Sequence, residues 1–188
     1  MALRRITAPA TKPVTNDEVA MHMRAELLDD YALVSAYIGA ITEKAENVLR
    51  RALITQTWEL VLDAFPSTEI LLPLSPIQSV TSIKYLNSDG IFTTMSASDY
   101  VVDTASEPGR IVPAYGKSFP VALDLAGSVI IRYVCGYGTA DAVPDSIKAW
   151  IMMNVATLYE NRESVSEIKV SETGVCDSLL MPYRIITW

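Results

Sequence analysis

The chain has a single histidine, His22, and any histidine-based catalytic site would have to use it. His22 falls in a segment of helical periodicity with Arg24 and Glu26 nearby, and the sequence contains no G-x-S-x-G nucleophile elbow. A lone histidine beside charged residues is typical of a helix surface. We therefore predict that His22 is a surface residue, that no residue is catalytic and that the protein is not an enzyme.

The residues that could bind a metal or a cofactor are equally sparse. Cys135 and Cys176 lie about forty residues apart, match no zinc spacing with the one histidine and allow only one possible pair, so we expect reduced thiols. Asp29 and Asp30 could bind a hard cation but are expected to cap a helix. The sequence contains neither of the glycine motifs that bind phosphate, G-x-x-x-x-G-K-[ST] and G-x-G-x-x-G. The sequence therefore predicts no metal and no cofactor.

Charge and hydropathy narrow the possible partners. Half of the 188 residues are apolar and the net charge is −7; residues 56–188 hold 8 of the 15 basic residues but 15 of the 22 acidic ones. An acidic surface repels phosphate, which argues against a protein that grips duplex DNA. The apolar runs are too short to span a bilayer, and no secretory signal is evident. We expect a soluble, cytoplasmic protein with extra apolar surface for contacts between subunits.

Residues 15–54 have helical periodicity. Thr15 and Glu18 fit a capping box that starts a first helix, and Asp29 and Asp30 offer the N-cap of a second helix with a long apolar stripe. Helical spacing returns after Pro144 and Asp145 and ends near residues 159–162, which read Tyr-Glu-Asn-Arg. The sequence thus predicts three helices.

Short strands separated by prolines fill the segment between the second and third helices. Alternation indicates a strand at 58–62, and further strands are expected at 69–72, 77–86, 91–95, 100–103, 110–112 and 129–134. Asn87 to Gly90 is expected to form a hairpin turn, and Gly136 and Gly138 to allow a tight exit toward the third helix. These patterns predict a small antiparallel barrel or sandwich.

The predicted fold is α+β, with a helical base that carries an inserted β unit. We assign residues 1–14 to a mobile N-terminal arm that includes Arg4, Arg5 and Lys12. Residues 15–54 and 143–162 form the helical core, 55–142 the β unit, and 163–188 a polar linker followed by a C-terminal docking tail.

The tail reads SLLMPYRIITW from Ser178 and permits two interpretations. Its apolar residues could complete the core of the chain itself, because apolar side chains usually lie inside. Alternatively, the segment could dock on a neighbouring chain, with Pro182 limiting its freedom and Tyr183 and Arg184 acting as anchors. The second interpretation predicts five partner-binding residues: Leu179, Leu180, Pro182, Tyr183 and Arg184.

Four segments in this order resemble the phage head-tail connector proteins, also called adaptor or head-completion proteins. They are the capped helical region 14–49, the strand TQTWELVLDAFP at 55–66, the segment 136–163 containing YENRE, and the closing LLMPYR at 179–184. The β segment 55–133 is longer than in the shortest members of that family. Ile185 to Trp188 lie beyond the pattern.

The resemblance implies a structural role in the virion, at the head-tail interface, after assembly in the host cytoplasm. Such proteins form a ring, ordinarily of twelve copies and sometimes from free monomers, which binds the portal on one side and a stopper or tail-completion protein on the other. DNA would pass through the channel without specific binding. The alternative is a small β-barrel binding module or a tail-tube component that does not bind a portal.

Overall fold

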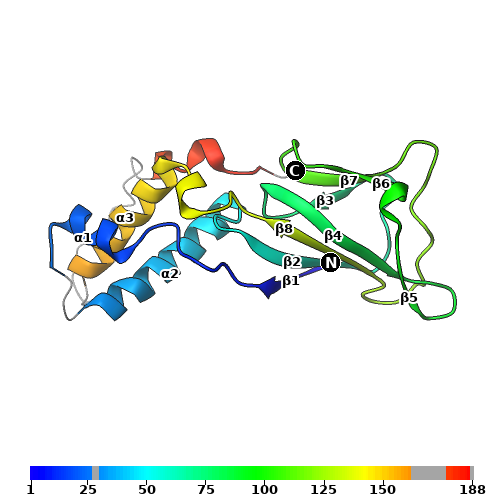
Figure 1. Ribbon diagram of the computed structural model, residues 1–188, viewed down its shortest axis with the longest axis horizontal. Helices are drawn as coiled ribbons and strands as arrows, with labels where there is room; N and C mark the ends of the chain where they lie inside the picture. Colours follow the sequence, from blue (N-terminus) through cyan, green and yellow to red (C-terminus); the bar gives the residue numbers. More distant parts are fainter. Residues whose placement is uncertain (27–29, 162–176, 187–188) are drawn as a thin grey trace. The chain divides into compact units, whose positions relative to one another are not determined.

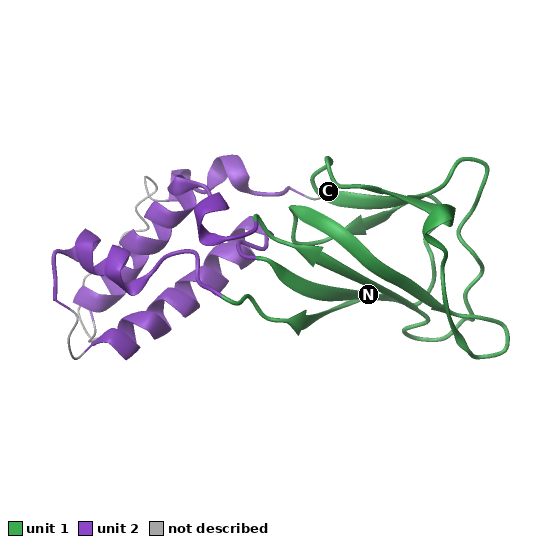
Figure 2. Ribbon diagram, in the orientation of Figure 1, with its two compact units in different colours: residues 1–10, 55–137, 187 green, residues 11–54, 138–186, 188 purple. Residues whose placement is uncertain are grey.

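The computed structural model describes residues 1–26, 30–161 and 177–186. They divide into two compact units, shown in Figure 2: a β unit of residues 1–10 and 55–137, and a helical unit of residues 11–54 and 138–186. Most of the expected linker, residues 163–176, lies outside the described residues. In the described part of the chain no helix has the length and apolarity that crossing a bilayer requires.

The fold is α+β, as predicted. The helical unit contains α1 (Asn16–Met23), α2 (Tyr31–Leu49) and α3 (Asp145–Glu160), with the short 3₁₀ turns η2 (Ala140–Ala142) and η3 (Met181–Tyr183). The β unit contains eight strands and the turn η1 (Ala97–Asp99): β1 (Ala2–Thr7), β2 (Gln56–Leu62), β3 (Ile70–Leu72), β4 (Ile77–Leu86), β5 (Phe92–Thr94), β6 (Tyr100–Asp103), β7 (Gly109–Pro113) and β8 (Val129–Cys135) (Figure 1).

The strands form two antiparallel sheets with the orders β1-β2-β8-β4-β5 and β3-β7-β6. Both sheets of the described chain have free edges, so the β unit is not a closed barrel. Gly109 of β7 lies directly against Ile77 of β4, where an added Cβ would come within 2.5 Å of Ile77 Cγ1. The Tyr133 hydroxyl of β8 donates to the Pro73 carbonyl after β3, at 3.1 Å. The two sheets therefore contact each other closely and share a buried interior.

Residues 2–7 correct the expectation of a mobile N-terminal arm. They form β1, which pairs with β2 from Ala2↔Val61 to Thr7↔Thr57. All six residues are exposed, so no apolar alternation marks the strand in the sequence. Its backbone hydrogen bonds with β2 hold it, and Arg4 adds an ion pair to Glu59.

The helix starts are only partly as expected. The capping box is present, with the Glu18 amide donating to Thr15 Oγ1 at 3.2 Å and the Thr15 amide donating to Glu18 at 2.6 Å. These bonds lower the pKa of Glu18, the backbone bond most of all. Asp30 does not cap α2 through its side chain; its carboxylate accepts instead from the Tyr159 hydroxyl at 2.7 Å. That bond ties the start of α2 to the end of α3, and Asp29 lies outside the described residues.

The predicted turns are present. Asn87 Oδ1 accepts from the amides of Asp89 and Ile91, at 3.0 and 2.9 Å, and Gly90 takes φ 74° between β4 and β5. Gly136 and Gly138 take φ 116° and 124° after β8, a backbone conformation that residues other than glycine rarely adopt. Glycine at these two positions permits the backbone conformations that the chain adopts directly after β8.

Candidate interaction surfaces

The C-terminal segment, residues 177–186, lies on the helical unit. The Ile185 amide donates to the Leu49 carbonyl at the end of α2, at 3.1 Å, and Arg51 Nε donates to the Tyr183 carbonyl. Leu180 is 2% exposed and Ile185 6%. Two buried side chains, one hydrogen bond to the last residue of α2 and one from Arg51 therefore fix the path of this segment.

The five predicted partner-binding residues fall into three groups. Leu180 is buried within the helical unit, Leu179 and Tyr183 are half-buried, and Pro182 and Arg184 are exposed. Met181 and Ile186, which the prediction left out, are 63% and 69% exposed. The segment is thus amphipathic: one side belongs to the core of its own unit, and the other side is available for contact.

Trp150 of α3 connects the segment to the helices. It is 1% exposed, and its Nε1 donates to Asp177 Oδ1 at 3.1 Å. Lys44 Nζ of α2 lies 5.8 Å from the centre of its ring. Sequence reasoning missed Trp150 as a core residue, although its place three residues after buried Ile147 was a usable signal.

One face of the five-stranded sheet carries a charge cluster centred on Glu59 of β2. Arg132 on β8 donates to Glu59 Oε1 through Nε at 2.9 Å and Nη2 at 2.5 Å, and Arg4 on β1 pairs with Glu59 Oε2. The Glu59 side chain is 4% exposed. Burial alone would raise the pKa of Glu59, but the two guanidinium groups outweigh it and lower that pKa.

A hollow of about 250 Å³ lies beside this cluster. It is lined by Glu59, Ser82, Lys84, Phe92, Ile130 and Arg132. Phe92 is half-exposed, and two of the three charged residues that line the hollow, Lys84 and Arg132, are basic. The hollow therefore differs in sign from the acidic chain as a whole.

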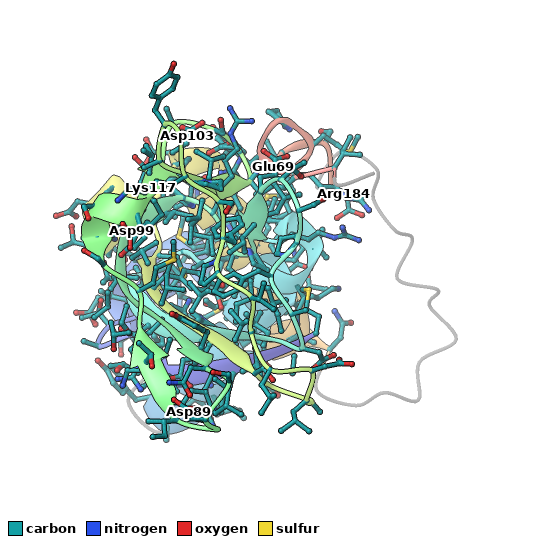
Figure 3. The ribbon with its side chains drawn as sticks, turned by 90° about the vertical axis from the view of Figure 1, so that its right-hand side faces the viewer. Glu69, Asp89, Asp99, Asp103, Lys117 and Arg184 are labelled. Carbon is teal, nitrogen blue, oxygen red and sulfur yellow. The ribbon has the colours of Figure 1, made fainter. Side chains whose placement is uncertain are left out.

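A second charge cluster lies on the three-stranded sheet. Arg110 of β7 donates to Asp103 Oδ2 of β6 at 3.0 Å and to Glu69 Oε2 before β3 at 3.1 Å. Asp99 pairs nearby with Lys117, and Figure 3 shows these two side chains adjacent, with Asp89 well apart from them in the β unit. The arginine on the central strand β7 therefore links β6 to the residue directly before β3.

Asp103 makes this cluster sensitive to pH. Its carboxylate accepts from Ser106 Oγ at 2.6 Å, from Arg110 and from the amides of Ala105 and Ser106; these bonds lower its pKa from 3.8 to about 2. A lowered carboxyl pKa stabilises the fold above the unfolded value, and the contribution is lost as pH falls from about 4 to about 2.

We therefore expect Asp103→Asn to lower the melting temperature at neutral pH, with the difference from the wild type disappearing between pH 4 and pH 2. Thermal unfolding followed by circular dichroism across this range measures it. Ser106→Ala removes the first cause of the shift, so the pH-dependent loss of stability should be smaller in this variant and should be complete at a higher pH than in the wild type. A melting-temperature gap that stays constant down to pH 2 would contradict the assignment.

The residues with enzyme-like chemistry do not converge. His22 is exposed on α1, as expected of a surface residue, and Cys135 is a buried free thiol on β8. Cys176 lies outside the described residues. Among residues 1–26, 30–161 and 177–186, no three histidine, cysteine or carboxylate side chains are grouped as metal ligands.

No protein-family model matches the chain, and no curated protein matches it. Solved structures do. The chain is 23% identical to a chain in the neck of an empty gene transfer agent particle computed with C6 symmetry, with a TM-score of 0.81, covering 100% of this chain and 97% of that one. The fold is shared from end to end.

Two further structures agree. One is the virion of a native gene transfer agent particle, at 22% identity and a TM-score of 0.82. The other is the neck of a native particle computed with C12 symmetry, at 22% identity and a TM-score of 0.76. Each match covers 100% of this chain and 97% of the other. The likeness in fold therefore includes both units of the described chain.

Proposed function

We propose that this protein is a structural head-tail connector of a tailed phage or phage-like particle. Twelve copies would form a ring below the portal, join the DNA-filled capsid to a stopper or tail-completion protein and line the channel through which DNA passes. The observation that carries the proposal is the likeness over the full chain to proteins in the neck and virion of gene transfer agent particles.

The physical character of the chain is compatible with this role. A cyclic ring needs two different contact surfaces on every subunit, and half of the residues are apolar. The chain carries a net charge of −7, so an acidic wall would offer DNA little gain from counterion release and would let it slide. The proposed role needs no catalytic group.

The C-terminal segment is the proposed contact with a partner ring. Leu180 and Ile185 hold it on the helical unit, while Pro182 and Arg184 present their side chains outward, with Leu179 and Tyr183 partly accessible. Arginine and tyrosine are frequent anchors at protein interfaces. A ring would present many copies at once, so that modest individual contacts add through multivalency.

Mixing the purified protein with portal-bearing particles tests the role. Mass photometry of the free protein and electron microscopy of the particles should show a monomer or small oligomer in solution and a ring on the portal vertex. A protein that polymerises with itself and ignores the portal would instead be a tail-tube component. Particles whose vertices remain bare at saturating protein would rule out the connector role.

A further inference from the structure

The five-stranded sheet ends in two unequal open edges. β1 forms one edge along all six of its residues. At the other end, β5 pairs with β4 across Lys84–Leu86, and the amide of Met95, directly after β5, donates to the Ile83 carbonyl at 2.8 Å, although β4 runs for ten residues from Ile77. Gln78, Ser79 and Thr81 in the first half of β4 are exposed. Each copy therefore carries two stretches of strand with backbone groups available to another chain.

The two arginines on β1 do not prevent another strand from pairing with its open edge. Exposed edge strands commonly carry charged side chains that disfavour pairing with a strand from another chain. Here Arg4 is drawn onto one face of its own sheet by Glu59, and Arg5 lies over the Trp58 ring, 5.9 Å from its centre, on β2. Both charges are occupied within the sheet, so the edge itself remains open.

Strand direction makes the two edges complementary. All neighbouring strands in this sheet are antiparallel, so β1 and β4 run in opposite directions. A rotation about an axis parallel to the strands leaves the direction of every strand unchanged. β1 of one copy, placed beside β4 of the next, therefore continues the antiparallel pattern. Such a contact joins two different surfaces and closes into a ring.

We infer that β1 of one copy pairs with the exposed half of β4 in the next copy, so that one antiparallel sheet runs around the ring. This inference rests on the proposed ring. Two bulges in β4, near Gln78 and Thr81, increase the local twist and bend that a sheet must have to follow a closed circle. The segment 77–83 carries no charge that would oppose the arginines of β1.

The pairing within one copy predicts the register between copies. Two rows of paired residues cross the strands β1, β2, β8 and β4. One row is Thr7, Thr57, Val134 and Ser79, and the other is Ala2, Val61, Ile130 and Lys84. If neighbouring copies are not displaced along the strand direction, Thr7 of one copy lies opposite Ser79 of the next and Arg4 opposite Ser82. The pairing ends there, because Ile83 and Lys84 already bond to Met95 and Thr94 of their own copy. Inside one copy Thr7 and Ser79 are three strand spacings apart, about 14 Å, which is too far for a disulfide.

Cysteine cross-linking on assembled rings tests the inference. The full chain with Cys176→Ser, Thr7→Cys and Ser79→Cys is assembled on portal-bearing particles and oxidised, and we expect a covalent ladder of dimers, trimers and larger species on a denaturing gel. Ala2→Cys with Ser79→Cys is the matched control, because these positions would lie about 16 Å apart along the strands. It should give at most a small fraction of that ladder.

The outcomes separate the inference from the proposed function. Rings that are visible by electron microscopy but give no ladder overturn the sheet extension and leave the connector role standing. Cross-linked dimers from Ala2→Cys with Thr7→Cys would show instead that two β1 strands pair about a twofold axis, and would also overturn it. Bare vertices with the wild-type protein overturn the connector role itself.

Discussion

Replacing Trp150 with alanine is expected to lower the free energy of unfolding of the helical unit by about 3–5 kcal/mol. The side chain is the largest among the fully buried ones of the described chain, and it packs in the helical unit that also contains buried Ile38 and Ile151. The substitution removes its whole volume and leaves Asp177 without the indole donor. Urea unfolding followed by far-ultraviolet circular dichroism, which reports mainly on the helices, measures the change.

Two variants separate the contributions. Trp150→Phe keeps most of the ring volume and loses only the Nε1 donor, so it should cost clearly less than the alanine variant. Leu158→Ala on the same helix removes an apolar side chain that is 38% exposed, and it should change stability by less than about 1 kcal/mol. Equal losses for Trp150→Ala and Leu158→Ala would mean that Trp150 is not a core residue.

Most strands could be predicted because their local signals are strong. β4 and β6 begin and end at the predicted residues, and the remaining predicted strands differ by one or two residues at their ends. β-branched and aromatic runs bounded by proline or by the Asn87–Gly90 turn mark them. In these segments local propensity and the final sheet agree.

β1 could not be predicted because nothing in Ala-Leu-Arg-Arg-Ile-Thr alternates between apolar and polar residues. The strand exists through its pairing with β2, whose partner residues are fifty or more positions away in the chain. Arg4 illustrates the point: in the sequence it is one charge near a terminus, whereas in the fold it pairs with a carboxylate that is almost completely buried. Such long-range pairing has no local signature.

The C-terminal segment shows why the sequence left core and docking as alternatives. The two interpretations apply to different side chains of the same ten residues, because Leu180 and Ile185 point into the helical unit whereas Met181, Pro182 and Arg184 are exposed. The segment has too few residues and too irregular a backbone for a period of 3.6 or 2 to separate these sides. Only the packing against the end of α2 assigns each residue.

Arg184→Glu is expected to weaken binding to portal-bearing particles at least about tenfold, while the melting temperature of the free protein stays within about 1–2 °C of the wild type. Arg184 is exposed, so the substitution removes little packing. In the proposed ring the lost contact would be repeated in every copy, so that small losses would multiply through avidity. Binding curves from mass photometry or pelleting, together with thermal unfolding of the free protein, measure both quantities.

The matched control is Leu180→Ala. Arg184→Glu should weaken portal binding without changing stability, whereas Leu180→Ala should lower stability. Leu180 is 2% exposed, so its truncation should cost about 2–5 kcal/mol of stability. Cutting the chain after Asp177 is a poorer test, because it removes Leu180 and Ile185 with the contact residues and confuses unfolding with lost docking. If Arg184→Glu bound portal particles as tightly as the wild type, and Met181→Asp did so too, the exposed side of the segment would not be the portal contact. The helical unit would then have to meet its partner through another surface, since Leu180 and Ile185 are already committed to its own core.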